Sequence, residues 1–284
     1  EAFGPVATLM PYQSTEEAIA LAKMGKGSLV SSIVTADKNI ARQYVLGAGT
    51  HHGRMLILND QCAKENTGHG SPLPLLVHGG PGRAGGGEEM GGIRGVKHYM
   101  QRVAIQGSPD MITAVSNVYQ PGATGNTKTI HPFKKYFEEL EIGDQRITEK
   151  RLISSEDIDR FADLSGDHFY AHLTQTDFAG TMFDKQVAHG YFIMSIAAGL
   201  FVDSYEKNPV LLNYGIDELR FTKPVYPGAE IHARFTCKEK IPQEKKEPSD
   251  IARGIVKWLV EMIDETNEIV GVATILTMVK KKIQ

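Results

Sequence analysis

The chain has 284 residues, of which 41% are hydrophobic and 23% charged, and its net charge at pH 7 is −3. These values are typical of one large or two ordinary globular domains, and they exclude the basic surface of a nucleic-acid-binding protein. No apolar run reaches the roughly 18 residues that a membrane span needs. Cys62 and Cys237 are far apart and lack metal-ligand spacing. We therefore predict a cytoplasmic protein with no nucleic-acid partner, no membrane partner and no bound metal.

The first 118 residues alternate helix and strand patterns, which is typical of an α/β domain. Residues 14–24 predict a helix that begins with Ser14 as its N-cap and Glu17 three positions later. A strand is expected at residues 29–34. Residues 119–133 are rich in Pro, Gly and Thr and lack periodicity, so they predict a linker. The expected domains are therefore 1–118 and 134–284.

The sequence pattern of the second domain predicts an α+β fold with two helices and four long strands. A helix at residues 155–164 has apolar residues on one face, and a helix near residues 190–205 is apolar nearly all round and should be buried on most sides. Strands are expected at residues 213–221, 230–238, 251–263 and 268–279, with a turn at 264–267 and a solvated hairpin loop at 238–246. An antiparallel sheet wrapped on one central helix is the hot-dog fold.

The residues with the clearest chemistry are Asp167 and His172, which follow a Ser-Gly pair, and the later pair His189-Gly190. Water addition to a double bond conjugated to a thioester needs a base, a proton source and a donor to the thioester oxygen. Asp167 and His172 could hold one water, and the N–H of Gly190 at a helix start could donate to the oxygen. Taken alone, the same residues also fit an ordinary turn and an ordinary helix start.

The run FADLSGDHFYAH at residues 161–172, followed by VAHG at 187–190, resembles the MaoC-like (R)-specific enoyl-CoA hydratase family. The resemblance covers about residues 134–284. It implies a CoA-thioester substrate, no cofactor for the hydration, water activation by Asp167 and His172, and an oxyanion hole at Gly190. One departure is Phe169-Tyr170, which stands where the family has Asn-Pro and would reshape the substrate pocket.

The first residues, EAFGPV, resemble the Glu-x-Phe-Gly-Pro motif of the aldehyde dehydrogenase family. The resemblance implies that Glu1 holds the ribose of the nicotinamide cofactor and that Phe3 packs near the nicotinamide. The Gly-rich residues 79–92 contain a G-x-G-x-x-G pattern, but no strand leads into it and no good helix follows, so it does not predict a Rossmann site. Because nothing precedes Glu1, we expect a partial dehydrogenase domain. The resemblance implies NADP as the cofactor of the intact dehydrogenase, and we expect no measurable NADP binding by this partial domain.

An aldehyde dehydrogenase ahead of a MaoC-like domain is similar to the bifunctional ring-opening enzymes of bacterial phenylacetate catabolism. The resemblance implies that water opens the ring of oxepin-CoA and that the resulting semialdehyde is oxidised with NADP. Two alternatives stay open: hydration of a linear (R)-enoyl-CoA, and a role as a dimerising assembly module for the dehydrogenase. Since hot-dog domains commonly pair their sheets, we also expect a homo-oligomer.

Overall fold

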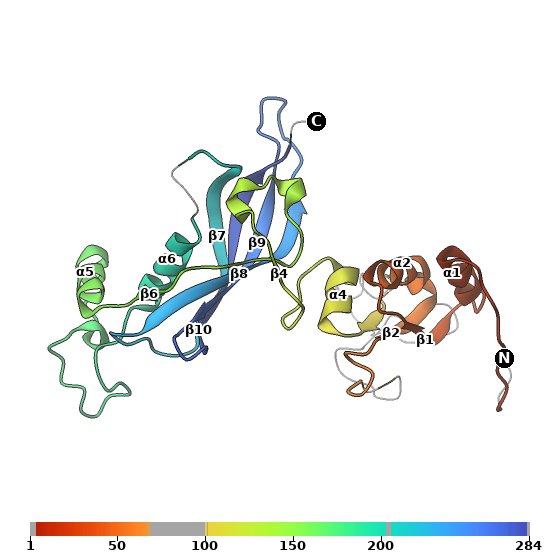
Figure 1. The fold of residues 1–284 in the computed structure, drawn as a ribbon, viewed down its shortest axis with the longest axis horizontal. Helices are drawn as coiled ribbons and strands as arrows, with labels where there is room; N and C mark the ends of the chain where they lie inside the picture. The colour runs from red at the N-terminus through yellow and green to blue at the C-terminus, as the bar shows by residue number, and fades with distance from the viewer. Residues whose placement is uncertain (1–3, 67, 69–99, 101, 203–205, 283–284) are drawn as a thin grey trace. The chain divides into compact units, whose positions relative to one another are not determined.

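The computed structural model describes residues 4–66, 68, 100, 102–202 and 206–282. The chain forms two compact units, Glu1–Ala123 and Thr124–Gln284, each with its own core (Figure 1). The boundary falls inside the segment expected to be a linker. Both ends of that segment are packed: the Tyr119 hydroxyl donates to the Ala123 carbonyl at 2.7 Å, and Phe133 belongs to the core of the second unit. The Gly-rich residues 79–92 lie outside the described part.

The first unit is a small parallel sheet covered by helices. Strands β1 (Ser28–Val34), β2 (His52–Leu58) and β3 (Ala104–Gln106) lie in that order and are all parallel. The predicted strand at 29–34 is confirmed by β1, and the predicted helix by α1 (Thr15–Lys23), whose N-cap Ser14 accepts a bond from the Glu17 N–H at 3.2 Å. Helices α2 (Lys38–Ala48) and α4 (Pro109–Ser116) supply the core together with β2, through Ala41, Tyr44, Val45, Ala48, Met55, Ile57, Met111 and Val115.

The second unit is built on one sheet with the strand order β4-β5-β8-β9-β10-β7. Its long strands β7 (Val210–Phe221), β8 (Glu230–Pro242), β9 (Arg253–Ile263) and β10 (Ile269–Lys280) are antiparallel, whereas β4 (Asn126–Thr127), β5 (Asp144–Ile147) and β6 (Arg151–Leu152) are short. The four predicted strands are confirmed. The predicted loop at 238–246 is wrong in its first half, because β8 continues until Pro242 pairs with Gly254.

Helix α6 (Gly190–Leu200) packs against β8 and β9 and forms the core with them. The ring of Phe201 just after it stacks on Phe235 with centroids 3.8 Å apart, and the Trp258 indole N–H donates to the Thr277 hydroxyl at 2.9 Å. This arrangement of helix and antiparallel sheet is the predicted hot-dog fold. The helix is less buried than the predicted burial on most sides, since its buried residues are Phe192, Ile193, Met194 and Ala197, whereas Tyr191 is 69% exposed.

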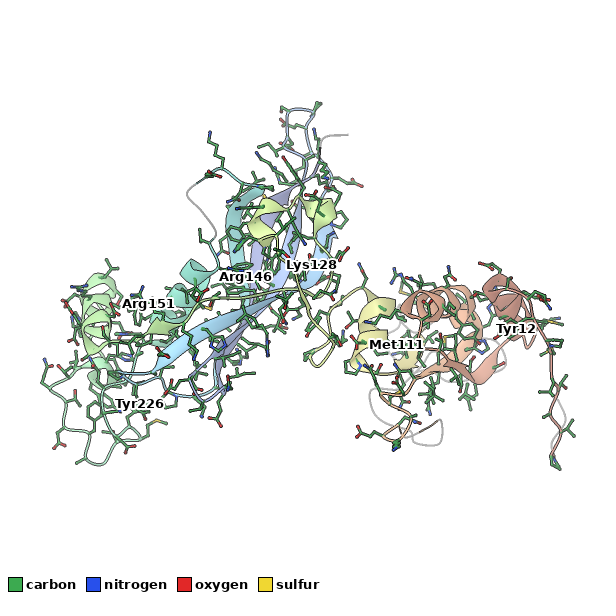
Figure 2. All side chains as sticks on the ribbon, viewed as in Figure 1. Tyr12, Met111, Lys128, Arg146, Arg151 and Tyr226 are labelled. Carbon is green, nitrogen blue, oxygen red and sulfur yellow. The ribbon has the colours of Figure 1, made fainter. Side chains whose placement is uncertain are left out.

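Four shorter elements complete the second unit: α5 (Ser155–Ser165), which confirms the predicted helix, and the 3₁₀ turns η4 (Pro132–Lys134), η5 (Phe137–Glu139) and η6 (Tyr170–His172). The segment that leads from η6 to α6 is tied to the turn before β8. There the Ala188 N–H donates to the Val225 carbonyl at 2.8 Å, and the Lys185 ammonium lies 5.2 Å from the ring centre of Tyr226. Tyr226 is labelled in Figure 2. In the described part of the chain, no helix has both the length and the apolar character to cross a membrane.

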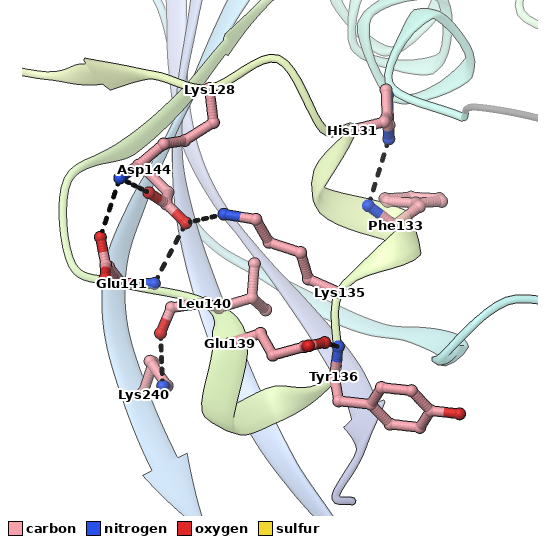
Figure 3. A network of polar contacts seen from close by, with 10 residues as sticks. All are labelled: Lys128, His131, Phe133, Lys135, Tyr136, Glu139, Leu140, Glu141, Asp144 and Lys240. Atoms are coloured by element: carbon pink, nitrogen blue, oxygen red, sulfur yellow. Dashed lines mark hydrogen bonds and ion pairs between the residues drawn. The ribbon is translucent and has the colours of Figure 1, made fainter.

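A buried ion pair fixes the start of β5 (Figure 3). The Asp144 side chain is 1% exposed, and its Oδ2 accepts from the Lys135 ammonium at 2.6 Å and from the Glu141 N–H at 3.1 Å. Its Oδ1 lies 4.0 Å from Lys128, whose side chain is 42% exposed. The carboxylate therefore depends mainly on Lys135 for its partner charge.

Candidate active site

The loop that carries Asp167 begins at a glycine. Helix α5 ends at Gly166, which has φ of 77° and therefore adopts a left-handed conformation that favours glycine. Asp167 follows directly and is exposed, and its Oδ1 accepts a bond from the Phe169 N–H at 3.2 Å. This hydrogen bond holds the carboxylate near the start of the loop.

His172 ends η6, and a single backbone bond fixes its ring. Its Nδ1 lies 2.7 Å from the Val187 carbonyl oxygen. Because a carbonyl oxygen only accepts, Nδ1 carries the proton, and Nε2 of the neutral ring is an unprotonated acceptor. Val187 is held in turn by its own N–H, which donates to the Ala171 carbonyl at 2.8 Å.

His189 is the N-cap residue of α6 and contacts both Asp167 and His172. It is 2% exposed, its Nε2–H donates to the backbone carbonyl of Asp167 at 2.9 Å, and its ring stacks on His172 with centroids 3.7 Å apart and planes 26° apart. Burial lowers the pKa of His189 below its ordinary value. The neutral, singly protonated ring that results at pH 7 is consistent with one donated bond.

Asp167, His172 and His189 each offer one polar atom within 4.8 Å of the other two. One water that makes two hydrogen bonds of ordinary length joins atoms up to about 4.6 Å apart, so atoms this close can share a single water. A metal ion fits less well. One nitrogen of each ring is already used, because His172 Nδ1 bonds the Val187 carbonyl and His189 Nε2 bonds the Asp167 carbonyl.

Gly190 is the first residue of α6, directly after His189. Its N–H donates no hydrogen bond to the residues that the structure describes, and it lies at the positive end of the helix dipole. A Cβ atom at this position would run into the ring of Phe221 at the end of β7. The site therefore presents a backbone donor at a position where any side chain would displace the Phe221 ring.

An aromatic rim adjoins the site. Phe169 and Tyr170 are 54% and 40% exposed, and their ring centroids lie 4.5 Å apart. Phe169 also lies 6.0 Å from the His172 ring. The two aromatics that replace the family's Asn-Pro are therefore next to the predicted catalytic imidazole.

The structure brings together Asp167 and His172, as expected, and places Gly190 directly after a residue that contacts both. Glu1 and Phe3, the predicted cofactor-binding residues, lie outside the described residues. Sequence reasoning assigned no role to His189, although it stands in the His-Gly pair at the start of an apolar helix. That position was the one available signal, because its contact with Asp167 spans 22 residues of sequence.

Comparison with known proteins identifies both parts of the chain. Residues 138–256 match the MaoC like domain, and residues 1–105 match the aldehyde dehydrogenase family. The chain is 54% identical over 252 residues to Protein MaoC of Klebsiella aerogenes, a match that covers 89% of this chain and 75% of that protein. The chain belongs to the MaoC family.

Two further relatives each match one part of this MaoC family member. A 3-hydroxybutyryl-CoA dehydratase of Methylorubrum extorquens is 31% identical over 111 residues, which are 39% of this chain and 69% of that protein. A 3,4-dehydroadipyl-CoA semialdehyde dehydrogenase of Aromatoleum evansii is 42% identical over 81 residues, which are 28% of this chain and 16% of that protein. The chain therefore joins an aldehyde dehydrogenase segment to a MaoC-like hot-dog domain.

Proposed function

We propose that the MaoC-like domain adds water to the double bond of an unsaturated CoA thioester. One observation carries the proposal: polar atoms of Asp167 and His172 lie within 4.8 Å of one another, close enough for one water to join them, and the Gly190 N–H at the start of α6 donates to none of the described residues. The relative that is named a 3-hydroxybutyryl-CoA dehydratase supports the substrate class, because dehydration is the reverse of this hydration.

The side chains supply the acid–base chemistry of the reaction. Asp167 and His172 hold the water together and act as its base, and one of its protons passes to the pair while the hydroxyl bonds to the β-carbon. The proton is then delivered to the α-carbon, so the substrate gains one water and the pair returns to its starting state. Such positioned proton transfer typically contributes about 10²- to 10⁴-fold to the rate.

The backbone stabilises the charge that develops during the addition. Attack at the β-carbon places negative charge on the thioester oxygen before the α-carbon is protonated. The N–H of Gly190, at the positive end of α6, is the proposed donor to that oxygen. One such donor is typically worth about 3 kcal/mol of transition-state stabilisation.

Within this substrate class, we propose oxepin-CoA as the substrate in phenylacetate catabolism. Addition of water to the ring carbon that bears the ether oxygen gives an adduct whose C–O bond breaks, which opens the ring and produces an aldehyde. The aldehyde dehydrogenase segment and its semialdehyde dehydrogenase relative support a second step, the NADP-dependent oxidation of that aldehyde in the intact enzyme. The rim of Phe169 and Tyr170 supports a flat cyclic acyl group.

A linear (R)-enoyl-CoA is the second candidate, favoured by the 3-hydroxybutyryl-CoA dehydratase relative. The test is a comparison of kcat/KM for oxepin-CoA and crotonyl-CoA, with products identified by mass. We expect oxepin-CoA to be preferred at least tenfold, and the preference to fall in Phe169→Asn/Tyr170→Pro. Equal or better turnover of crotonyl-CoA would replace the cyclic substrate by the linear one.

A further inference from the structure

The side chain of His189 contacts both proposed catalytic residues. It donates to the backbone carbonyl of Asp167 at 2.9 Å and stacks on the His172 ring at 3.7 Å. As the N-cap residue of α6 it also precedes Gly190 directly. The buried His189 ring therefore adjoins Asp167, His172 and the residue whose N–H is the proposed oxyanion donor.

The chemistry of this ring indicates more than packing. Its Nδ1 is buried and has no hydrogen-bond partner among the described residues. Leaving a buried polar atom unpaired typically costs about 1 to 3 kcal/mol. The Phe161 ring lies 5.0 Å from His189 and also packs against Phe192, 5.3 Å away. A phenylalanine at position 189 would fill similar space without that cost, but it could not donate to Asp167.

We propose that His189 is a positioning residue for the hydration. Its Nε2–H fixes the backbone on which the Asp167 carboxylate sits, and its ring face holds the His172 imidazole at the angle at which Nε2 meets the water. The inference rests on the proposed function and adds a residue to it. His189 is 2% exposed and its Nε2–H is occupied by the Asp167 carbonyl, so in this proposal it acts through its two neighbours.

Two substitutions separate the hydrogen bond from the packing. His189→Phe keeps a stacking ring and removes the donor, whereas His189→Gln keeps an amide donor at a similar reach and removes the ring. We expect kcat for hydration to fall about 10- to 100-fold in His189→Phe with KM changed less than about threefold, because small displacements of catalytic groups cost rates of this order. His189→Gln should recover about tenfold over His189→Phe.

A matched control and a second readout keep the test decisive. Phe192→Leu disturbs the same helix core without touching the loop, and it should leave kcat within about twofold. Nitrogen-15 NMR of His172 should report a single Nδ1–H tautomer in the wild type and in His189→Phe, which both keep the ring stack and the Val187 carbonyl, and a mixture in His189→Gln, which loses the stack. A purely structural role predicts the opposite order of activity, with His189→Phe as active as wild type, and that result or an unchanged tautomer in His189→Gln would overturn the proposal. If the wild type hydrates no thioester, the proposed function fails, while the NMR comparison still decides the role of His189.

Discussion

The ion pair between Lys135 and Asp144 allows a quantitative test of how the second unit is held together. Lys135→Met removes the ammonium 2.6 Å from a carboxylate that is 1% exposed and leaves that carboxylate with one N–H donor and an exposed lysine at 4.0 Å. Breaking a buried pair by removing one partner typically costs about 3 to 5 kcal/mol. Since the Glu141 N–H and Lys128 remain, we expect the lower end of this range, about 3 kcal/mol.

The assay is urea unfolding followed by the fluorescence of Trp258, which is the only tryptophan in the chain and lies in the core of the second unit. The control is Lys150→Met, the same substitution at an ion pair of 3.8 Å whose side chains are 56% and 49% exposed, where we expect a loss below about 1 kcal/mol. The double variant Lys135→Met/Asp144→Leu should recover most of the stability. A loss in Lys135→Met no larger than that in Lys150→Met would refute the reasoning.

Three further predictions concern the site, its pH dependence and the edge of the sheet. Gly190→Ala should lower kcat at least tenfold because its Cβ meets the Phe221 ring. Gly199→Ala in the same helix is the control and should leave kcat unchanged, because a Cβ there meets nothing within 4 Å. Equal effects of the two substitutions on kcat would contradict the site geometry. Burial lowers the pKa of His189 and of His232 in the folded state, so the unfolded state binds more protons. The unfolding free energy measured by Trp258 fluorescence should therefore fall as the pH is lowered through 6.5; a flat profile from pH 7 to 5 would count against this. Strand β7 lies at the edge of the sheet with Leu212, Tyr214 and Ile216 exposed, so we expect this edge to form the contact between copies of the chain. Tyr214→Lys/Ile216→Lys should convert the oligomer to a monomer in sedimentation equilibrium. An unchanged mass would place the contact between copies elsewhere.

Local sequence patterns were sufficient for α1, β1, α5 and the four long strands, whereas the other helices and strands of the first unit and the short strands of the second were not predicted individually. The 3.6-residue spacing of Ile158, Phe161 and Ala162 predicted α5, and Ser14 with Glu17 predicted where α1 begins. Pro242 misled the prediction of β8, because proline often ends a strand. Here it is the last residue of the strand and pairs with Gly254, so its missing N–H removes little from the ladder.

The tertiary contacts of the site could not be read from spacing. The five-residue separation of Asp167 and His172 indicated a catalytic pair, but the tautomer of His172 depends on a carbonyl fifteen residues away, and the bond from His189 reaches Asp167 across twenty-two. The exposed face of α6 was missed for a related reason. An apolar helix does not reveal how much of its circumference one sheet covers.

The most direct test of the central claim is the ultraviolet assay of oxepin-CoA ring opening by wild type and Asp167→Asn, with Trp258 fluorescence showing that both variants are folded. We predict that the wild type consumes oxepin-CoA and adds one water, and that Asp167→Asn is at least about 100-fold slower, as expected for loss of the base. Turnover by Asp167→Asn at the wild-type rate would contradict the account.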